Sequence, residues 1–283
     1  MSHHHDPPPE CSALRWSAWT ERGPIRPNNE DAFLGLCFDG REIHHLGKFG
    51  DASCESMDFV FAVSDGMGGA KAGEYASRIT TEKISTLLPR SFQQSAAGLK
   101  AGFPDLLEEL FDQIHRALAF LGGSYQECAG MEATLSLCWI TPGQVYFGHI
   151  GDSRIYYLPA GETAVKQLTQ DDTHVAWLLR QGQINEREAR SHPRRNVLQK
   201  ALGGSNQFVD PQVGAVGYEP GDILLLCSDG LVEGLYDHDM AELLRAADSA
   251  NPARRLVEAA LAKGARDNVT ALVIEAVRGT RPI

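Results

Sequence analysis

Residues 59–66 read Phe59-Val-Phe-Ala-Val-Ser-Asp65-Gly66, an apolar run that ends directly in an aspartate. A short apolar run bounded by turn-forming residues is typical of a buried strand. Asp65 would then stand at the end of that strand, on the edge of a dry core. Because a buried carboxylate is costly unless it is paired or holds a cation, we interpret Asp65 as a candidate metal ligand.

The same pattern occurs twice more along the chain. Residues 223–229 run from an apolar stretch into Asp229, and residues 145–152 run from another into Asp152. An isolated Asp-Gly pair usually marks a turn. Three aspartates at the ends of apolar runs, two of them in an identical Ser-Asp-Gly context, instead favour one shared site.

Further acidic residues extend this set. Glu30 and Asp31 precede the apolar residues 32–34, and Asp267 precedes a predicted strand at 269–273. These candidates all offer oxygen ligands, and no set of histidines and cysteines at ligand spacing accompanies them, which favours Mg²⁺ or Mn²⁺ over zinc or copper. The isolated histidines are interpreted as structural; they are His115, His149, His174 and His192.

Arg26 lies just before the acidic pair Glu30-Asp31. A guanidinium beside carboxylate-bound metal ions suits a phosphate substrate, because its planar fork binds two phosphate oxygens. Without the neighbouring acids, Arg26 would be interpreted as an ordinary surface arginine.

The remaining pattern indicates an α+β fold. Predicted strands occupy residues 59–63, 133–140, 145–150, 154–158, 165–168, 223–227 and 269–273. Apolar spacing predicts helices at 74–88 and 105–121, and Asn251 is a candidate cap for a third helix that begins at Pro252. Turn residues between neighbouring strands, at 142–143 and 159–161, predict antiparallel hairpins. Such a series predicts sheet packed on sheet with helices outside.

Composition places the chain among ordinary globular proteins. Its 283 residues are 43% hydrophobic, and they contain neither an apolar stretch long enough for a membrane span nor a signal-peptide pattern at the start. The net charge of −11 argues against a nucleic-acid partner, which needs a basic surface. Six scattered cysteines indicate reduced thiols in the cytoplasm, at positions 11, 37, 54, 128, 138 and 227. We expect a monomer with one domain at 13–277 between tails at 1–12 and 278–283.

These motifs together resemble the PPM family, the type 2C metal-dependent protein phosphatases, in their bacterial form. The similarity covers nearly the whole chain, and the motifs follow the family's order. They occupy residues 23–31, 61–69, 148–154, 192–203, 224–231 and 267–270. Any one of them is weak, but six in order are specific.

The resemblance implies a four-layer α/β/β/α sandwich of two antiparallel sheets flanked by helices, with two metal ions at one end. It implies the following ligands: Asp65 bridging both ions, Asp229 and Asp267 on the first, and Glu30 with the Gly66 carbonyl on the second.

Other roles also come from the resemblance. Asp31 would hold metal-bound waters, and Arg26 would bind the phosphate. Asp152, with Asp229, would form a third and weaker metal position. Residues 171–200 would form a mobile flap that helps to select the substrate.

The activity implied is hydrolysis of phosphoserine and phosphothreonine in proteins that a serine/threonine kinase has phosphorylated. A water shared by two Mn²⁺ or Mg²⁺ ions would attack phosphorus in line, without a phosphoenzyme.

Three positions depart from the family pattern. Met67 stands where many members have a histidine proposed as the general acid, so water would protonate the leaving oxygen. Glu132-Ala133-Thr134 replaces Gly-Thr-Thr, which we interpret as a packing variation. Asp172 stands where a histidine follows Asp171, which affects the entry to the flap.

Other function classes are less consistent with these residues. A nucleotide-binding loop is disfavoured because Lys71 is followed by alanine rather than Ser or Thr. A cysteine-based phosphatase needs an arginine six positions after its cysteine, and none of the cysteines has one. A catalytically inactive, phosphatase-like binding or regulatory domain would have lost ligands at 65, 229 or 267, and all three are aspartate here. An active enzyme for a small phosphoester stays open.

Overall fold

β5, Asp58–Met67, contains the apolar run of residues 59–63 and lies at the centre of the fold. Side chains of successive strand residues point to opposite faces. Phe59, Phe61 and Val63 therefore face the core between the two sheets, while Val60 and Ala62 face the helices. The computed structural model describes residues 12–39, 42–55, 57–68, 71–96, 102–205, 208–246 and 251–278.

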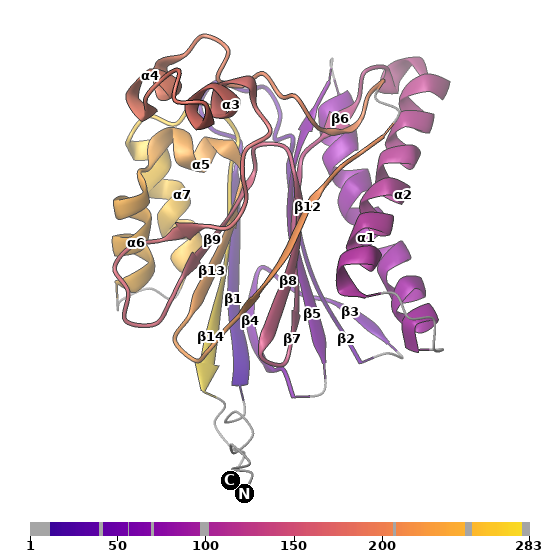
Figure 1. Cartoon of the computed structure of the whole chain (residues 1–283), viewed down its shortest axis with the longest axis vertical. Helices are drawn as coiled ribbons and strands as arrows, with labels where there is room; N and C mark the ends of the chain where they lie inside the picture. The colour runs from indigo at the N-terminus through magenta and orange to yellow at the C-terminus, as the bar shows by residue number, and fades with distance from the viewer. Residues whose placement is uncertain are drawn as a thin grey trace, which may run out of the picture.

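Two antiparallel sheets pack face to face (Figure 1). The larger has the order β11 (Leu202–Gly203), β6 (Glu132–Ala133), β5, β7 (Leu135–Thr141), β8 (Gln144–Ile150) and β12 (Gln212–Gly217). In addition, β2 (Asp31–Phe38) pairs with β5, and β3 (Ile43–His45) pairs with β2. The smaller has the order β10 (Lys166–Gln167), β9 (Arg154–Leu158), β13 (Ile223–Cys227), β14 (Val269–Arg278), β1 (Ser12–Glu21) and β4 (Phe49–Ser53).

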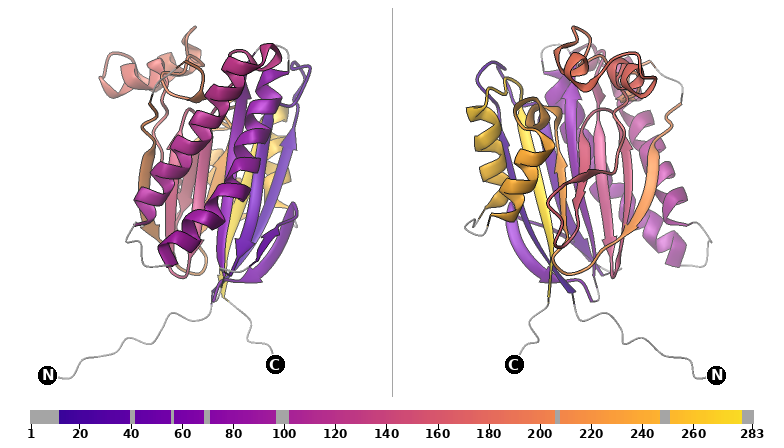
Figure 2. Two further views of the ribbon diagram at one scale, coloured as in Figure 1. Left: turned by 90° about the vertical axis from the view of Figure 1, so that its right-hand side faces the viewer. Right: turned by 60° about the vertical axis from the view of Figure 1, so that its left-hand side comes forward.

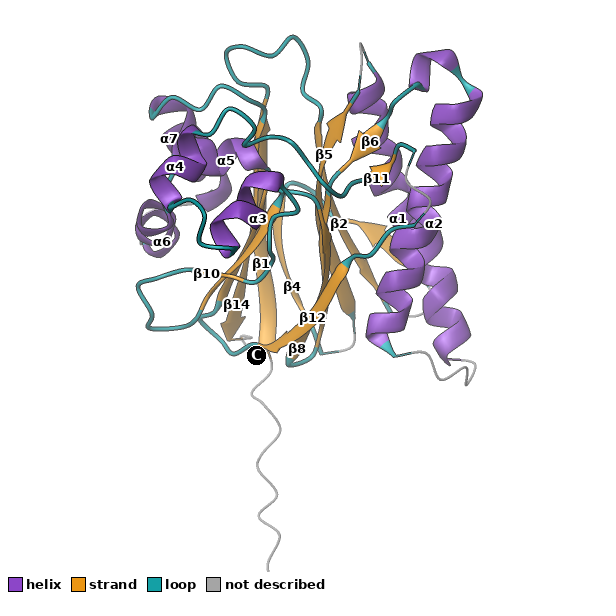
Figure 3. Ribbon diagram, turned by 45° about the horizontal axis from the view of Figure 1, so that its top comes forward, coloured by secondary structure: helices purple, strands orange, loops and turns teal. Residues whose placement is uncertain are grey.

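Helices cover the outer face of each sheet, which completes the expected α/β/β/α sandwich (Figures 1 and 2). The long helices α1 (Ala72–Ala96) and α2 (Phe103–Ser124) pack on the larger sheet, and the short η1 (Gln126–Cys128) follows α2. The smaller sheet is covered by α5 (Asp229–Gly234), α6 (Asp237–Arg245) and α7 (Pro252–Ala262). Seen from above, α3 (His174–Arg180) and α4 (Glu186–Ser191) lie next to α5, on the same side of the molecule (Figure 3).

Most predicted elements are present. The strands at 154–158 and 223–227 have the predicted bounds, and the Asn251 side chain caps α7 by accepting a hydrogen bond from Arg254 N at 3.0 Å. The predicted strand at 133–140 is instead divided at Thr134. Its backbone N donates to Asp65 O at 2.8 Å and its hydroxyl accepts from Asp65 N at 3.0 Å, which holds this residue against the end of β5.

Cys37, Cys54, Cys128, Cys138 and Cys227 are free thiols, whereas Cys11 lies outside the described ranges, as do the predicted tails apart from their innermost residues. None of the helices in the described part of the chain is long and apolar enough to cross a membrane.

Candidate metal centre

Asp65 and Asp31 stand directly opposite each other where β5 and β2 meet. Asp65 continues the alternation of Phe61 and Val63, so it points into the space between the sheets. Burial, and then the charge of Asp31, raises the pKa of Asp65 well above its ordinary value. Two carboxylates in this position repel each other, and a cation between them would remove that cost.

The second sheet adds Asp229 and Asp152 to the same region. Asp229 begins α5 directly after β13 and Ser228, and Asp152 lies where the chain crosses from β8 in one sheet to β9 in the other. Burial, followed by the charge of Asp152, raises the pKa of Asp229 well above its ordinary value. Burial, followed by the charge of Asp171, raises the pKa of Asp152 to about 7.

Two of these carboxylates have an oxygen without a partner. Asp31 Oδ1 and Asp229 Oδ1 are buried and make no hydrogen bond to any described residue. Buried polar atoms are nearly always satisfied, so each orphan calls for an explanation, and a bound cation provides one. Within the described ranges, no group of three or more His, Cys, Asp or Glu side chains is arranged so that it could hold a metal ion. The donors nevertheless fit a hard divalent ion in charge and type.

Asp31 is held in place by two hydroxyl groups from the opposite sheet. Ser228 Oγ and Thr270 Oγ1 both donate to Asp31 Oδ2, at 2.7 Å and 2.6 Å. Both bonds favour the charged form, but burial has the larger effect and raises the pKa of Asp31 to about 6. The partnered oxygen thus fixes the side chain and leaves Oδ1 for another ligand.

Glu30 and the Gly66 carbonyl converge beside Gly73, near the start of α1. A Cβ atom built on Gly73 would lie 2.6 Å from Glu30 Oε1 and 2.6 Å from Gly66 O. Both oxygens therefore face a space that exists only because residue 73 has no side chain. This supports the pairing of Glu30 and Gly66 that the resemblance implies. Burial raises the pKa of Glu30, as it does for Asp31, Asp65, Asp152 and Asp229.

Asp267 and Arg26 meet at the rim of the site. Arg26 Nη2 lies 2.5 Å from Asp267 Oδ2, and the nearby Gly23 has a φ of +75°. A Cβ atom on Gly23 would lie 2.1 Å from Asp267 O, so the loop that carries Arg26 packs directly on the backbone of Asp267. Asn268 ties the same loops together, because its Oδ1 accepts from Glu30 N at 2.7 Å.

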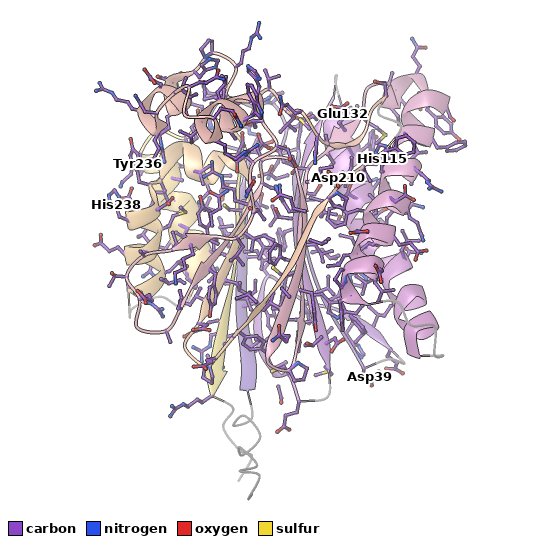
Figure 4. The ribbon with its side chains drawn as sticks, viewed as in Figure 1. Asp39, His115, Glu132, Asp210, Tyr236 and His238 are labelled. Atoms are coloured by element: carbon purple, nitrogen blue, oxygen red, sulfur yellow. The ribbon has the colours of Figure 1, made fainter. Side chains whose placement is uncertain are left out.

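A groove of about 880 Å³ leads from this centre to the flap. One end is lined by Asp152, Asp229 and Asp267, and the walls come from the flap and from α5 and α6. Tyr236 and His238 mark its outer wall (Figure 4).

The comparisons decide the family. Residues 49–266 match the family described as Protein phosphatase 2C. The chain belongs to this family. It is 33% identical over 267 residues to the serine/threonine protein phosphatase PstP of Mycobacterium tuberculosis (strain ATCC 25618 / H37Rv), over 93% of this chain and 45% of that protein. It thus spans less than half the length of that relative.

One further relative, and the separate catalytic domain of PstP, are covered over nearly their whole length. The serine/threonine phosphatase stp of Listeria innocua serovar 6a is 31% identical over 258 residues, which cover 90% of this chain and 93% of that protein. A crystal structure of the catalytic domain of PstP in complex with 2 manganese ions superposes with a TM-score of 0.72 at 31% identity, covering 94% of this chain and 99% of that one.

In this phosphatase 2C chain, the positions that depart from the family pattern have defined contacts. Met67 and Glu132 are opposite each other in the pairing of β5 and β6. The Glu132 carboxylate lies against Gly204, where a built Cβ atom would be 2.0 Å from its Oε1 (Figure 4). Asp172 closes the base of the flap, since its Oδ2 accepts from Gly151 N at 3.1 Å.

The isolated histidines contact hydroxyl, backbone and aromatic groups of the described residues. Burial lowers the pKa of His149 to about 4, so the ring is neutral, and its Nδ1 lies 2.9 Å from Ser136 Oγ. His115 Nδ1 accepts from Gly203 N at 3.1 Å, and His192 Nδ1 from Arg194 N at 3.1 Å. The ring of His174 stacks on the exposed Trp177.

Sequence reasoning missed Gly73 and Asn268. The signal for Gly73 was a glycine seven residues after Gly66, near the start of a predicted helix. The signal for Asn268 was a polar residue beside a candidate ligand. Neither signal is specific, because the contact that matters in each case is with a residue far away in the chain.

Proposed function

We propose that this chain is an enzyme that hydrolyses phosphoserine and phosphothreonine in proteins with the help of Mn²⁺ or Mg²⁺. The observation that carries the proposal is the pairing of Asp31 with Asp65, beside Asp229, whose charge adds to burial and to the charge of Asp31 in raising the pKa of Asp65. Two buried oxygens, one on Asp31 and one on Asp229, have no partner among the described residues. A domain that only bound other proteins would gain nothing from this costly arrangement. PstP, a relative, has been crystallised with 2 manganese ions.

The residues present fit two metal positions. In the first, Asp65, Asp229 and Asp267 would be ligands; in the second, Asp65, Glu30 and the Gly66 carbonyl. When bound, such ions lower the pKa of a water molecule and neutralise charge on phosphoryl oxygens. After burial, the charge of Asp152 has the largest effect in raising the pKa of Asp229, which supports a third and weaker position between them.

Side chains of the protein would bind the phosphoryl group and orient the water. Arg26 has five N–H donors and uses one of them on Asp267, so others are available for the phosphoryl oxygens. Asp31, held through Oδ2, would orient water through Oδ1. Because Met67 has no acidic proton, the leaving serine or threonine oxygen would take its proton from water.

The wider setting follows from the same proposal. We place the catalytic domain at 13–277, with the flap at 171–200 selecting among phosphorylated proteins made by a serine/threonine kinase. The enzyme would act as a monomer in the cytoplasm.

Hydrolysis of a phosphothreonine peptide and of p-nitrophenyl phosphate tests this, with Mn²⁺, Mg²⁺ or EDTA and with Asp229→Asn beside the wild type. We expect turnover that needs metal and is lost in the variant. Turnover of p-nitrophenyl phosphate without any turnover of the peptide would point to a small phosphoester as substrate. Folded protein with no turnover would favour a catalytically inactive binding domain.

A further inference from the structure

Two arginines of the flap attach it to α5. Arg195 Nη2 pairs with Glu233 Oε1 at 3.2 Å. Arg190 donates to the carbonyls of Val232 and Leu235 at 3.3 Å and 3.4 Å, and its guanidinium lies 3.8 Å from the ring centre of Tyr236 (Figure 4). The flap is therefore held by side-chain contacts to the helix that starts at Asp229.

Glu233 makes a second contact with its other oxygen. Oε2 accepts a hydrogen bond from the backbone N of Arg266 at 2.9 Å, and Arg266 is the residue before Asp267. One half-buried carboxylate thus joins the flap to the loop that carries a predicted metal ligand.

The helix that carries Glu233 has no room to shift. A Cβ atom on Gly230 would lie 2.0 Å from Asn268 O, and one on Gly234 would lie 2.5 Å from Ala260 O. α5 is therefore in direct backbone contact with the 267–268 loop on one side and with α7 on the other. Because closely packed interiors transmit strain, we expect a displacement of Glu233 to reach the segments that carry Asp229 and Asp267.

The groove connects these contacts to the substrate. Flap residues, including Arg190 and Arg195, form one wall, and Glu233 with Tyr236 forms the facing wall. Its inner end reaches Asp229 and Asp267. A peptide in the groove would press on the two walls that Glu233 holds together.

We propose that Glu233 is a positioning residue that couples the flap to the metal ligands, so that a phosphopeptide in the groove and divalent metal at Asp229 and Asp267 strengthen each other's binding. This inference rests on the proposed function. Such coupling is reciprocal: the peptide increases the affinity of the protein for the metal by the same factor as the metal increases its affinity for the peptide.

The chain offers variants that separate the two contacts of Glu233. Arg195→Ala removes only the flap contact. Glu233→Gln removes the ion pair and keeps a carbonyl oxygen for Arg266 N. Arg194→Ala is the matched control, because the Arg194 side chain makes no hydrogen bond or ion pair to any described residue.

Calorimetry measures the dissociation constant of Mn²⁺ for each protein, with and without a peptide that carries a non-hydrolysable phosphonate analogue of phosphothreonine. In the wild type and Arg194→Ala we expect the peptide to lower the dissociation constant of Mn²⁺ by about 5-fold or more. In Arg195→Ala and Glu233→Gln this factor should fall to near one, while Mn²⁺ binding without peptide stays close to that of the wild type. The KM for a phosphopeptide should rise in both variants relative to Arg194→Ala.

The outcomes distinguish this inference from the proposed function. If the wild type neither binds Mn²⁺ nor hydrolyses p-nitrophenyl phosphate, the proposed function is wrong and the coupling with it. If it does both, but the wild type shows no coupling or the two variants keep it, this inference alone is overturned. Circular dichroism and thermal unfolding establish that each variant is folded.

Discussion

The hydroxyl of Ser228 donates a hydrogen bond to Asp31 Oδ2 at 2.7 Å and so joins the end of β13 in one sheet to the start of β2 in the other. This bond links the two halves of the carboxylate group across the sandwich. It also holds one oxygen of Asp31 and leaves the other for water or a cation.

Ser228→Ala should weaken both the fold and the site. A hydrogen bond to a charged group contributes about 1.5–3 kcal/mol, so we expect the free energy of unfolding to fall by an amount in that range. Activity should fall several-fold because Asp31 is less well fixed. Urea unfolding measures the first effect; Ser205→Ala, an exposed serine, should change stability by less than about 0.5 kcal/mol.

The stability of the metal-free protein should depend on pH in an unusual direction. Asp31 and Asp152 have folded-state pKa values of about 6 and about 7, above the ordinary value of 3.8. The folded state therefore binds more protons than the unfolded state between about pH 4 and 7, and these groups make stability fall as pH rises through that window.

We expect the Tm of the EDTA-treated protein to rise as pH is lowered from 8 towards 5, and Mn²⁺ to reduce that dependence. Asp152→Asn should flatten the metal-free profile. A Tm that instead falls steadily with acidification, in the wild type and in the variant alike, would contradict this. Because metal binding requires charged carboxylates, Mn²⁺ affinity should also weaken below about pH 7.

Gly73→Ala should remove one of the two metal positions. The new methyl would stand 2.6 Å from both Glu30 Oε1 and Gly66 O, so the two oxygens could no longer serve one ion. We expect Mn²⁺ stoichiometry to fall from two to one by calorimetry, with activity reduced by about 100-fold or more, the scale seen when a catalytic charge stabiliser is lost.

The control is Gly123→Ala. Gly123 lies in α2, and a Cβ atom there would meet nothing within 4 Å. This change should keep both metals and add about 0.5–1 kcal/mol of stability, because alanine favours the helix. Two bound ions in Gly73→Ala would show that Glu30 and Gly66 do not share one.

Arg26→Lys should lower kcat/KM although it keeps the positive charge. A lysine ammonium cannot bind two phosphoryl oxygens in a planar fork while also contacting Asp267. We expect a loss of about 10-fold or more for both the peptide and p-nitrophenyl phosphate, since the phosphate is common to both. Full activity in Arg26→Lys would show that the planar guanidinium is not needed to bind the phosphoryl oxygens.

Much of the candidate site was predictable from local pattern. The run before Asp65 and the run before Asp229 form the predicted strands β5 and β13, because a short, continuously apolar segment must be buried on both faces. An aspartate directly after such a strand must lie at the edge of the core. These inferences depend only on neighbours in the chain.

By itself, then, the sequence determined the layered fold and predicted the acidic donors of the proposed metal positions. Only the tertiary structure decided which oxygens are already used and which remain available. Glu30 and Gly66 meet beside Gly73, and Glu233 joins Arg195 to Arg266. The reason is physical: local periodicity sets which face of an element is buried, but side-chain contacts between distant segments depend on how two sheets and their helices pack in three dimensions.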